Sequence, residues 1–282
     1  MSNPPSTNRR ALPHVGAVNY LNSKPLIHGL DQLSDRLCLL LDLPSRLADS
    51  LAKGWIDVAL IPSIEFFRNR EYVIVTDACI ACHGPVLSVK LFFRVPPEDV
   101  RRLALDEGSR TSEALARILL KEKFGVAPEL EPLAIGATLD DTSADAVLLI
   151  GDRAIPESRG PFVEIWDLGD QWCQWTGLPF VFAMWVARAG EDFGILSSLL
   201  TEARDAGVRN INMIAEREAR LLDIDAGLAR QYLSENLHFT LGERERHGLE
   251  HFHMLCARHG LISTGFDCKT NLRPATFSAA HA

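Results

Sequence analysis

VLSVKLFFRV (86–95) is a long β-rich run, and a second apolar run of the same kind is WTGLPFVFAMWV (175–186). Between them the chain alternates short apolar stretches with helical patterns, such as the helix expected from Thr111 to Lys123 and the buried strand from Ala146 to Ile150. Two extended runs on either side of such a block indicate that the chain leaves one lobe, builds a second and returns. The two runs would then form a hinge, with a ligand in the cleft.

The residues before the first run also alternate between strand and helix patterns. Val15 to Tyr20 and Val58 to Ile61 are strand-like, and Leu47 and Leu51 lie one turn apart in a helix that stops at Gly54. This alternation predicts a mostly parallel sheet with helices on both faces. Together with the inserted block, it predicts an α/β, two-lobed fold of the type II periplasmic-binding-protein kind, with two hinge-crossing strands.

The expected domain organisation follows from these crossings. Residues 1–13 are a polar lead-in that we expect to be disordered, residues 14–92 and 185–282 form lobe one, and residues 93–184 form the inserted lobe two. A chain of 282 residues exceeds the usual size of a single core, which agrees with two lobes. The last helix is expected from about Glu243 to Arg258.

Two strand-to-helix turns carry polar residues that suit a small anion. The first turn contains Asn22, and the second contains Ser109-Arg110-Thr111-Ser112. A helix N-terminus presents unpaired backbone N–H groups and the positive end of the helix dipole, so hydroxyls and an arginine there predict a site for a carboxylate or phosphate. Ser or Thr followed by Glu113 is also a capping signature, and a plain helix cap remains the alternative.

The composition narrows the class of partner. The net charge of −8 argues against nucleic acid, and it requires local positive groups wherever an anion binds. No apolar run approaches the roughly 18 residues that a membrane span needs. Met1 to Pro13 lacks the apolar core of a secretory signal. We therefore expect a cytoplasmic protein with a small-molecule ligand and with neither nucleic acid nor membrane as partner.

Neither the cysteines nor the histidines predict a metal or a cofactor. Cys79 and Cys82 form a C-x-x-C pair, but no second pair accompanies it and no helix begins at Cys79. HGLEH (247–251) matches the H-x-x-E-H pattern of some zinc peptidases, yet Asp267 is the one carboxylate side chain that follows it. We interpret the thiols as structural and the histidines as part of a solvated helix face.

Seven short segments in order are specific when taken together: VNYLNSKPL (18–26), LPSRLA (43–48), DVALIPSIE (57–65), GPVLSVKL (84–91), SRTS (109–112), IGDRA (150–154) and WTGLPFVFA (175–183). This set resembles the chorismate dehydratases of the futalosine route to menaquinone, over roughly residues 14–260. The resemblance implies the binding-protein fold used as an enzyme, a lyase that converts chorismate and releases water to give 3-[(1-carboxyvinyl)oxy]benzoate. It also implies Asn22 and Ser88 as catalytic residues.

The implied chemistry can be compared with the residues. The C3 proton of chorismate is γ to the ring carboxylate through a C=C bond, so its loss gives an extended enolate that expels the C4 hydroxyl. Such an enzyme must hold two carboxylates, stabilise growing negative charge and position a base. The expected substrate contacts are Tyr20, Ser63, Ser109, Arg110, Thr111, Ser112, Thr176 and Gly177.

Two questions stay open at this stage. The base is either His83, which lies beside the Gly84-Pro85 turn, or the enolpyruvyl carboxylate of the substrate itself, with the enzyme fixing the geometry; we favour the second. The function has two alternatives. One is the 1,4-dihydroxy-6-naphthoate synthases of the same pathway, which share the fold and would carry a histidine in the cleft. The other is a non-catalytic protein that binds a small anion.

Overall fold

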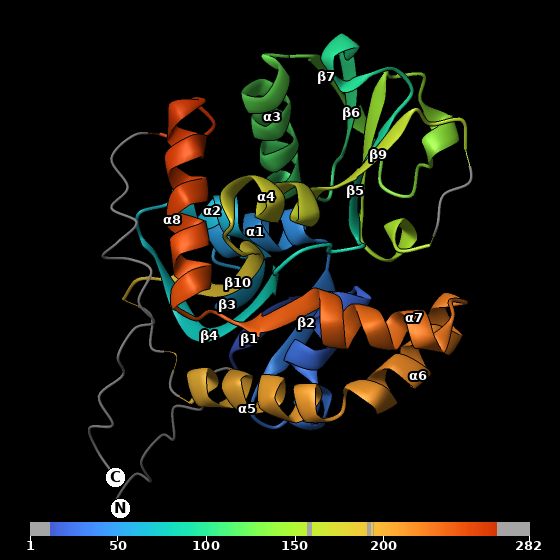
Figure 1. Ribbon diagram of the computed structural model, residues 1–282. Coiled ribbons are helices and arrows are strands. Elements are labelled where there is room, and N and C mark those ends of the chain that lie inside the picture. The colour runs from blue at the N-terminus through green and yellow to red at the C-terminus, as the bar shows by residue number, and fades with distance from the viewer. Residues whose placement is uncertain (1–11, 157–159, 191–192, 194, 264–282) are drawn as a thin grey trace, which may run out of the picture.

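The computed structural model describes residues 12–156, 160–190, 193 and 195–263, which form two lobes around two β-sheets (Figure 1). The first sheet has the strand order β11 (Leu237–Thr240), β4 (Tyr72–Cys82), β10 (Phe180–Arg188), β3 (Val58–Pro62), β1 (His14–Val18) and β2 (Cys38–Asp42). The second has the order β7 (Glu129–Leu133), β6 (Arg102–Asp106), β8 (Ala146–Ile150), β5 (Val89–Phe93) and β9 (Glu164–Asp167). The two-lobed α/β prediction is confirmed. The expected lead-in falls, apart from residues 12 and 13, outside the described residues.

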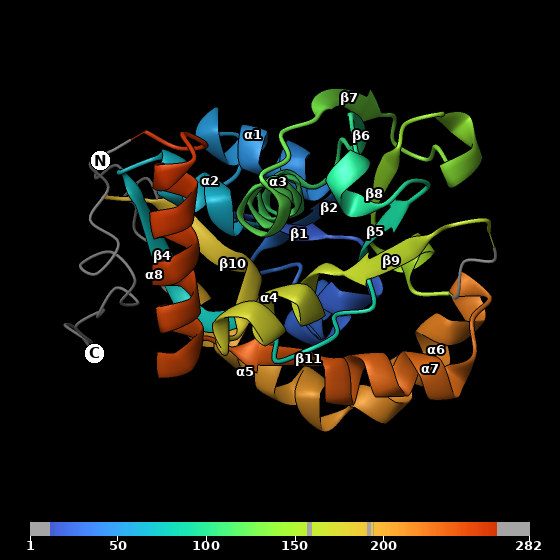
Figure 2. The same ribbon diagram turned by 45° about the horizontal axis from the view of Figure 1, so that its top comes forward.

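Helices pack against both sheets. α3 (Arg110–Phe124) packs beside α2 (Ser63–Arg68), α4 (Leu168–Thr176) and α8 (Glu243–Arg258). Figure 2 shows α3 end-on between α8 and the second sheet. α5 packs on β4 and on the short 3₁₀ helix η1 (Leu21–Ile27). The helices are α1 (Pro44–Ala52), α2 (Ser63–Arg68), α3 (Arg110–Phe124), α4 (Leu168–Thr176), α5 (Leu196–Arg209), α6 (Ile211–Leu222), α7 (Ala226–Gln231) and α8 (Glu243–Arg258).

Both sheets are mixed, which corrects the expectation of mostly parallel strands. β1 is parallel to β2 and β3, and β6 is parallel to β7 and β8. β10 is antiparallel to β3 and β4, and β5 is antiparallel to β8 and β9. The chain enters β5 and β10 from the other lobe rather than through a βα crossover within the same sheet, so these strands are not required to run parallel to their neighbours.

The chain changes sheets at residues other than those expected. β5 belongs to the second sheet, although lobe one was expected to run to Phe92, and β10 lies in the first sheet from Phe180, although lobe one was expected to resume at residue 185. The first crossing is the non-strand segment 83–88, and the second passes through α4, where Trp175 and Thr176 are helical rather than extended. An apolar extended pattern is the same in either sheet, so it does not locate the change of sheet.

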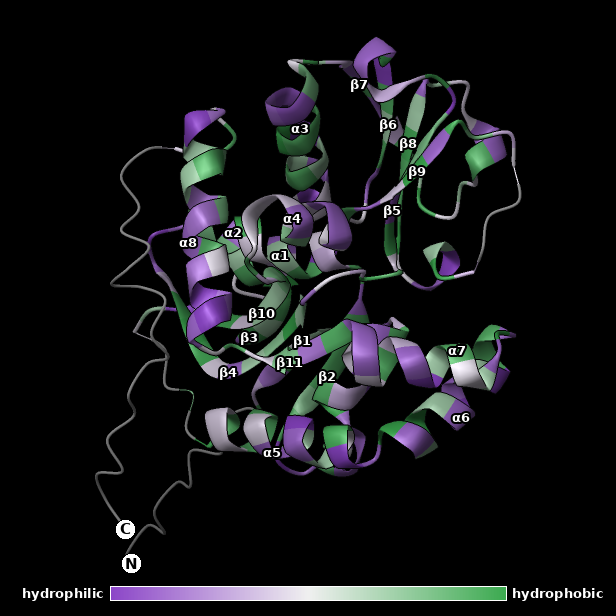
Figure 3. Ribbon diagram, viewed as in Figure 1, coloured by the Kyte–Doolittle hydropathy of each residue, from purple (hydrophilic) through white to green (hydrophobic). Residues whose placement is uncertain are grey.

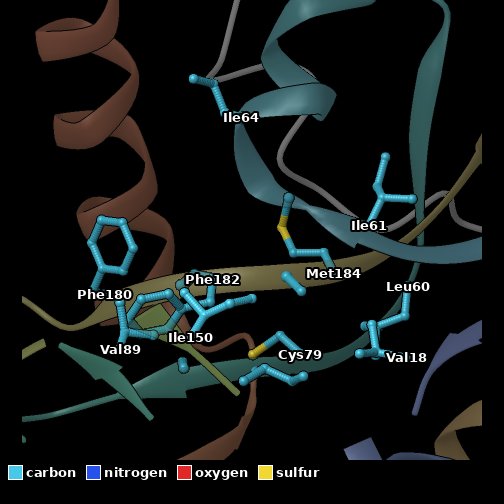
Figure 4. Close-up of a cluster of buried hydrophobic side chains, with 14 of the residues drawn as sticks. Val18, Leu60, Ile61, Ile64, Cys79, Val89, Ile150, Phe180, Phe182 and Met184 are labelled. Carbon is cyan, nitrogen blue, oxygen red and sulfur yellow. The ribbon is translucent and has the colours of Figure 1, made fainter. Parts of the chain in front are cut away.

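Most of the buried hydrophobic residues form one cluster that extends through both lobes. Figure 3 shows apolar residues along central strands such as β10 and β5, and a mixture of polar and apolar residues along α7 and α8. Figure 4 shows Val89 and Ile150 of the second sheet beside Phe180 and Phe182 of β10, where the lobes meet. Within the described residues, no helix is both long and apolar enough to span a membrane.

The cysteine pair lies inside the first sheet. Cys79 and Cys82 are both on β4 and fully buried. Burial raises the pKa of both thiols, so neither is a reactive thiolate near neutral pH.

Candidate active site

A cleft with about 530 Å³ of empty space, part of it open to solvent, lies between the lobes. It lies at the carboxyl ends of β1, β3 and β8, the edge at which α/β sheets bind ligands. None of its sixteen lining residues carries a charged side chain. They are Val18, Tyr20, Asn22, Pro44, Pro62, Ile80, Val86, Ser88, Val89, Ser109, Thr111, Ser112, Ile150, Gly151, Phe182 and Ala183.

The first-lobe wall is the turn from β1 into η1. Tyr20 is the residue before η1, and its ring packs on Gly151 of the second lobe. Gly151 has a φ of +73°, and a Cβ there would lie 2.9 Å from Tyr20 Cζ, so glycine is required for both the backbone and the close approach. Burial, and next to it the charge of Asp106, raise the pKa of Tyr20 to about 12. The phenol therefore stays neutral at physiological pH.

The second-lobe wall is the N-terminus of α3. Ser109 is the N-cap residue, yet its side chain makes no capping hydrogen bond, which contradicts the capping alternative. The hydroxyl of Ser109 is therefore free for a ligand, as are the backbone N–H groups of the first turn that no cap occupies. With Thr111 and Ser112 beside it, this helix start can bind a carboxylate without a nearby cation.

Asp106 precedes this helix but does not repel an anion in the cavity. Its Oδ1 accepts the N–H of Gly108 at 3.0 Å, its Oδ2 accepts that of Ile150 at 3.3 Å, and Arg153 pairs with the same Oδ2. The carboxylate is thus neutralised within the second lobe, where it fixes the loop that leads into α3.

Ser88 and Asn22 approach the cavity from different elements and share one neighbour. The hydroxyl of Tyr232 donates a hydrogen bond to Ser88 Oγ at 2.8 Å, and the side chain of Asn22 also bonds to the Tyr232 hydroxyl. Asn22 Oδ1 is buried and has no hydrogen-bond partner. A buried amide oxygen without a partner, on a residue that lines a cavity, can accept a hydrogen bond from a ligand hydroxyl that reaches it.

Ser88 is also held through the backbone. Leu87 has a φ of +59°, and the N–H of Ser88 bonds to the carbonyl of Val86 at 2.7 Å, which is γ-turn geometry. The carboxylate of Asp167, the N-cap residue of α4, accepts the N–H groups of Val86 and Leu87. Asp167, at the start of the second crossing, therefore contacts the backbone of the first crossing immediately before Ser88.

Six of the residues proposed from sequence line the cavity, namely Tyr20, Asn22, Ser88, Ser109, Thr111 and Ser112. Arg110 does not line it. Its guanidinium reaches across to the first lobe, where Nη2 lies 2.8 Å from Asp49 Oδ1 and Nη1 lies 3.5 Å from Glu65 Oε2. Ser63 lies behind the lining, where its hydroxyl donates to the carbonyl of Val181. Arg110 and Ser63 therefore connect elements around the cavity, and neither reaches into it.

The other three candidates lie elsewhere. Thr176 and Gly177 end α4: the threonine hydroxyl donates to the carbonyl of Trp172, and Gly177 adopts the left-handed conformation of a helix C-cap. His83 pairs with the buried Glu245 and stacks on His238 with ring centroids 3.8 Å apart. None of the three is among the lining residues.

The H-x-x-E-H segment has a packing explanation. Gly248 lies where a Cβ would be 2.1 Å from the carbonyl oxygen of Pro179, so α8 approaches the second crossing closely only with glycine. The ring of His251 packs against Trp172 and Trp175. Among the described residues, no three His, Cys, Asp or Glu side chains are grouped so as to hold a metal ion.

Sequence reasoning missed Tyr232, Asp167 and Gly151. Tyr232 lies 144 residues from Ser88 and belongs to no local motif. Asp167 precedes a helix, but its bonds to Val86 and Leu87 span about 80 residues. Gly151 had a signal in the sequence, because it directly follows a buried strand, and a glycine there often marks a place where another chain segment approaches closely.

The two lobes and the neutral cavity between them define a small-molecule-binding protein of the periplasmic-binding-protein fold class. The periplasmic aliphatic sulphonate binding protein SsuA from Escherichia coli has this fold: it is 14% identical, the TM-score is 0.66, and the match covers 97% of this chain and 96% of that one. The chain belongs to the menaquinone biosynthesis family, whose model matches residues 13–258.

Two curated relatives are chorismate dehydratases. The protein of Thermus thermophilus is 36% identical over 256 residues, which cover 84% of this chain and 93% of the relative. The protein of Campylobacter jejuni is 27% identical over 214 residues, which cover 76% of this chain and 81% of the relative.

Proposed function

We propose that this chain is a chorismate dehydratase, a cytoplasmic lyase of menaquinone biosynthesis that forms 3-[(1-carboxyvinyl)oxy]benzoate. The observation that carries the proposal is that Asn22 and Ser88 face the same cavity as the uncapped start of α3. The activity of the two relatives supports it.

One substrate carboxylate binds at the start of α3. The hydroxyls of Ser109 and Ser112 and the free backbone N–H groups donate to it, and the helix dipole adds about 1 kcal/mol. The hydroxyl of Thr111 lines the same wall but accepts the N–H of Ile64 at 3.3 Å and lies 3.4 Å from Ser63 Oγ. The ring lies against the apolar lining, including Ile80 and Phe182. In this proposal, neutral hydrogen-bond donors bind the carboxylate in place of Arg110, which the sequence suggested for that role.

The reaction breaks the C3–H and C4–O bonds of chorismate. The C3 proton passes to a base, the electron pair moves through the diene towards the ring carboxylate, and the C4 oxygen leaves and takes up one proton as water. The charge of the dianion is unchanged, and no electron enters or leaves. Hydrogen-bond donors near the C4 oxygen and the ring carboxylate stabilise the charge that develops there.

The cavity favours the substrate as its own base. None of the sixteen lining residues is a carboxylate or a histidine, and Tyr20, with its pKa near 12, stays protonated. The enolpyruvyl carboxylate is covalently tied to C3, so the enzyme need only hold it in reach of the C3 proton. The absence of a lining histidine also weighs against the naphthoate synthase alternative.

The test is to incubate the purified protein with chorismate. Loss of the diene absorbance, together with an aromatic product lighter by one water in mass spectrometry, is the expected result. Binding of chorismate without turnover would instead indicate a non-catalytic binding protein. Unchanged chorismate with no binding would favour the sister enzyme class.

A further inference from the structure

Tyr232 lies directly behind the cavity. It begins the π-helical turn Tyr232–Asn236 between α7 and β11, its side chain is 0% exposed, and it is not among the lining residues. Its hydroxyl lies 2.8 Å from Ser88 Oγ. A phenol in this position cannot touch a ligand in the cavity, but it can determine how Ser88 does.

The hydroxyl protons can be accounted for one by one. Tyr232 has one proton, and it is donated to Ser88 Oγ. Ser88 therefore accepts from behind, and its own proton must be directed elsewhere. Because Ser88 lines the cavity, that proton is available to a ligand. Without Tyr232, Ser88 could turn its proton away from the cavity.

The position of the Tyr232 proton also determines the orientation of the Asn22 amide. Since the only proton of Tyr232 goes to Ser88, the amide NH₂ of Asn22 is the donor in its contact with the Tyr232 oxygen. This leaves Asn22 Oδ1 as the unpaired atom, in agreement with its lack of a partner. Tyr232 thereby leaves the Ser88 proton as the free donor and Asn22 Oδ1 as the free acceptor of these two lining residues.

The orientation persists across the working pH range because Tyr232 keeps its proton. Burial raises the pKa of Tyr232 far above that of a free tyrosine, and the hydrogen bonds with Ser88 and Asn22 oppose this rise only in part. The Ser88 hydroxyl as donor and Asn22 Oδ1 as acceptor together match a ligand hydroxyl group, which accepts at its oxygen and donates through its hydrogen.

We propose that Tyr232 is a positioning residue for the dehydration: it orients Ser88 to donate a hydrogen bond to the departing C4 oxygen of the substrate and Asn22 Oδ1 to accept a hydrogen bond from the C4 hydroxyl, which keeps its proton. This inference rests on the proposed function. The proton that completes the water molecule is the one removed from C3, so neither Tyr232 nor Ser88 changes its protonation state over the cycle.

The test is Tyr232→Phe, which keeps the ring and removes the hydroxyl. We expect kcat to fall about tenfold, the scale of one oriented hydrogen bond, and KM to change less than about threefold. The matched control is Tyr72→Phe, which removes the hydroxyl of another buried tyrosine, on β4 and outside the lining. Its kcat should stay within about twofold of the original.

A double-mutant cycle shows whether Tyr232 acts through Ser88. In a Ser88→Ala background, Tyr232→Phe should lower kcat by no more than about twofold further, because the group it orients is already absent. Additive losses, an unchanged kcat in Tyr232→Phe, or a Tyr232→Phe chain that fails to fold would each overturn the inference. An unmodified protein that does not turn over chorismate would overturn the proposed function as well, which separates the two failures.

Discussion

The carboxylate of Asp167 accepts the backbone N–H of Leu87 at 2.6 Å, and Leu87 has a φ of +59°. A bulky residue in the left-handed region costs about 1–3 kcal/mol and persists only where neighbours hold it. Here the strained residue immediately precedes Ser88. The geometry of Ser88 therefore depends on a side chain from the other crossing.

Asp167→Asn tests this dependence. The amide places a donor where the carboxylate accepted from Val86 and Leu87, so at least one buried N–H loses its partner. We expect the free energy of unfolding in urea to fall by about 1–3 kcal/mol and kcat to fall with it. Asp170→Asn, in the same helix turn, alters a side-chain contact with Gln174 and a charge in the first turn of α4 but no backbone partner of the crossing, and should cost under about 1 kcal/mol. Equal losses in the two variants would contradict the special role of Asp167.

Asn22→Ala and Ser88→Ala each remove a polar group that faces the cavity. If these groups stabilise the reacting region, kcat should fall by about 100-fold while chorismate still binds, as measured by isothermal titration calorimetry. His83→Ala should retain most activity, because His83 pairs with Glu245 outside the lining. An inactive His83→Ala alongside two active variants would assign the base to the imidazole.

Arg110→Ala tests whether this arginine contacts the substrate. Its guanidinium is occupied by Asp49 and Glu65, so we expect KM to change less than about threefold. The stability should change by less than about 1 kcal/mol, because Asp49 is half exposed and such pairs are weak. Ser112→Ala, two residues further along α3 and in the lining, should raise KM more. A tenfold rise in Arg110→Ala would restore the carboxylate contact expected from sequence.

Asp152 should make stability depend on pH. Its Oδ1 accepts the N–H of Leu21 across the lobes at 2.9 Å, and burial raises its pKa from 3.8 to about 6. Because the folded chain binds this proton more tightly, the stabilisation is complete below about pH 4 and is lost as the pH rises towards 6.

Asp152→Asn keeps the acceptor and removes the charge. It should raise the free energy of unfolding by about 1–3 kcal/mol at pH 7 and by almost nothing at pH 4. Asp35→Asn, at an exposed carboxylate, is the matched control. A difference between Asp152→Asn and the original chain that is the same at both pH values would rule out this titration as its cause.

Local sequence patterns predicted those helices whose ends and buried faces are determined by residues within the helix itself. α1 begins at Pro44 and buries Leu47 and Leu51, and α8 spans the expected residues. The start of α3 was predicted from the small polar residues that lead into a helical pattern, and the observed helix begins at Arg110, one residue before the expected Thr111. These elements depend on spacing and end signals, which are present in the sequence itself.

Features decided by distant residues could not be predicted in this way. Arg110 lies at a helix start whether it points into the cavity or away, and Asp49 and Glu65 of the other lobe decide the direction. Trp175 fits an extended run and a helix equally, until Trp172 and His251 pack around it. Tyr232 becomes relevant only when the fold brings it to Ser88.

The uncharged lining bears on how the substrate arrives. Hydroxyls and helix N–H groups act over a few ångströms, whereas the net charge of −8 repels a dianion over a Debye length of about 8 Å at physiological ionic strength. Dissolved ions screen that repulsion and leave the short contacts largely unchanged. The encounter rate, followed as kcat/KM, should therefore increase with ionic strength, opposite to enzymes that attract anions with arginines. Higher ionic strength is therefore expected to increase the rate at which this enzyme and its substrate associate.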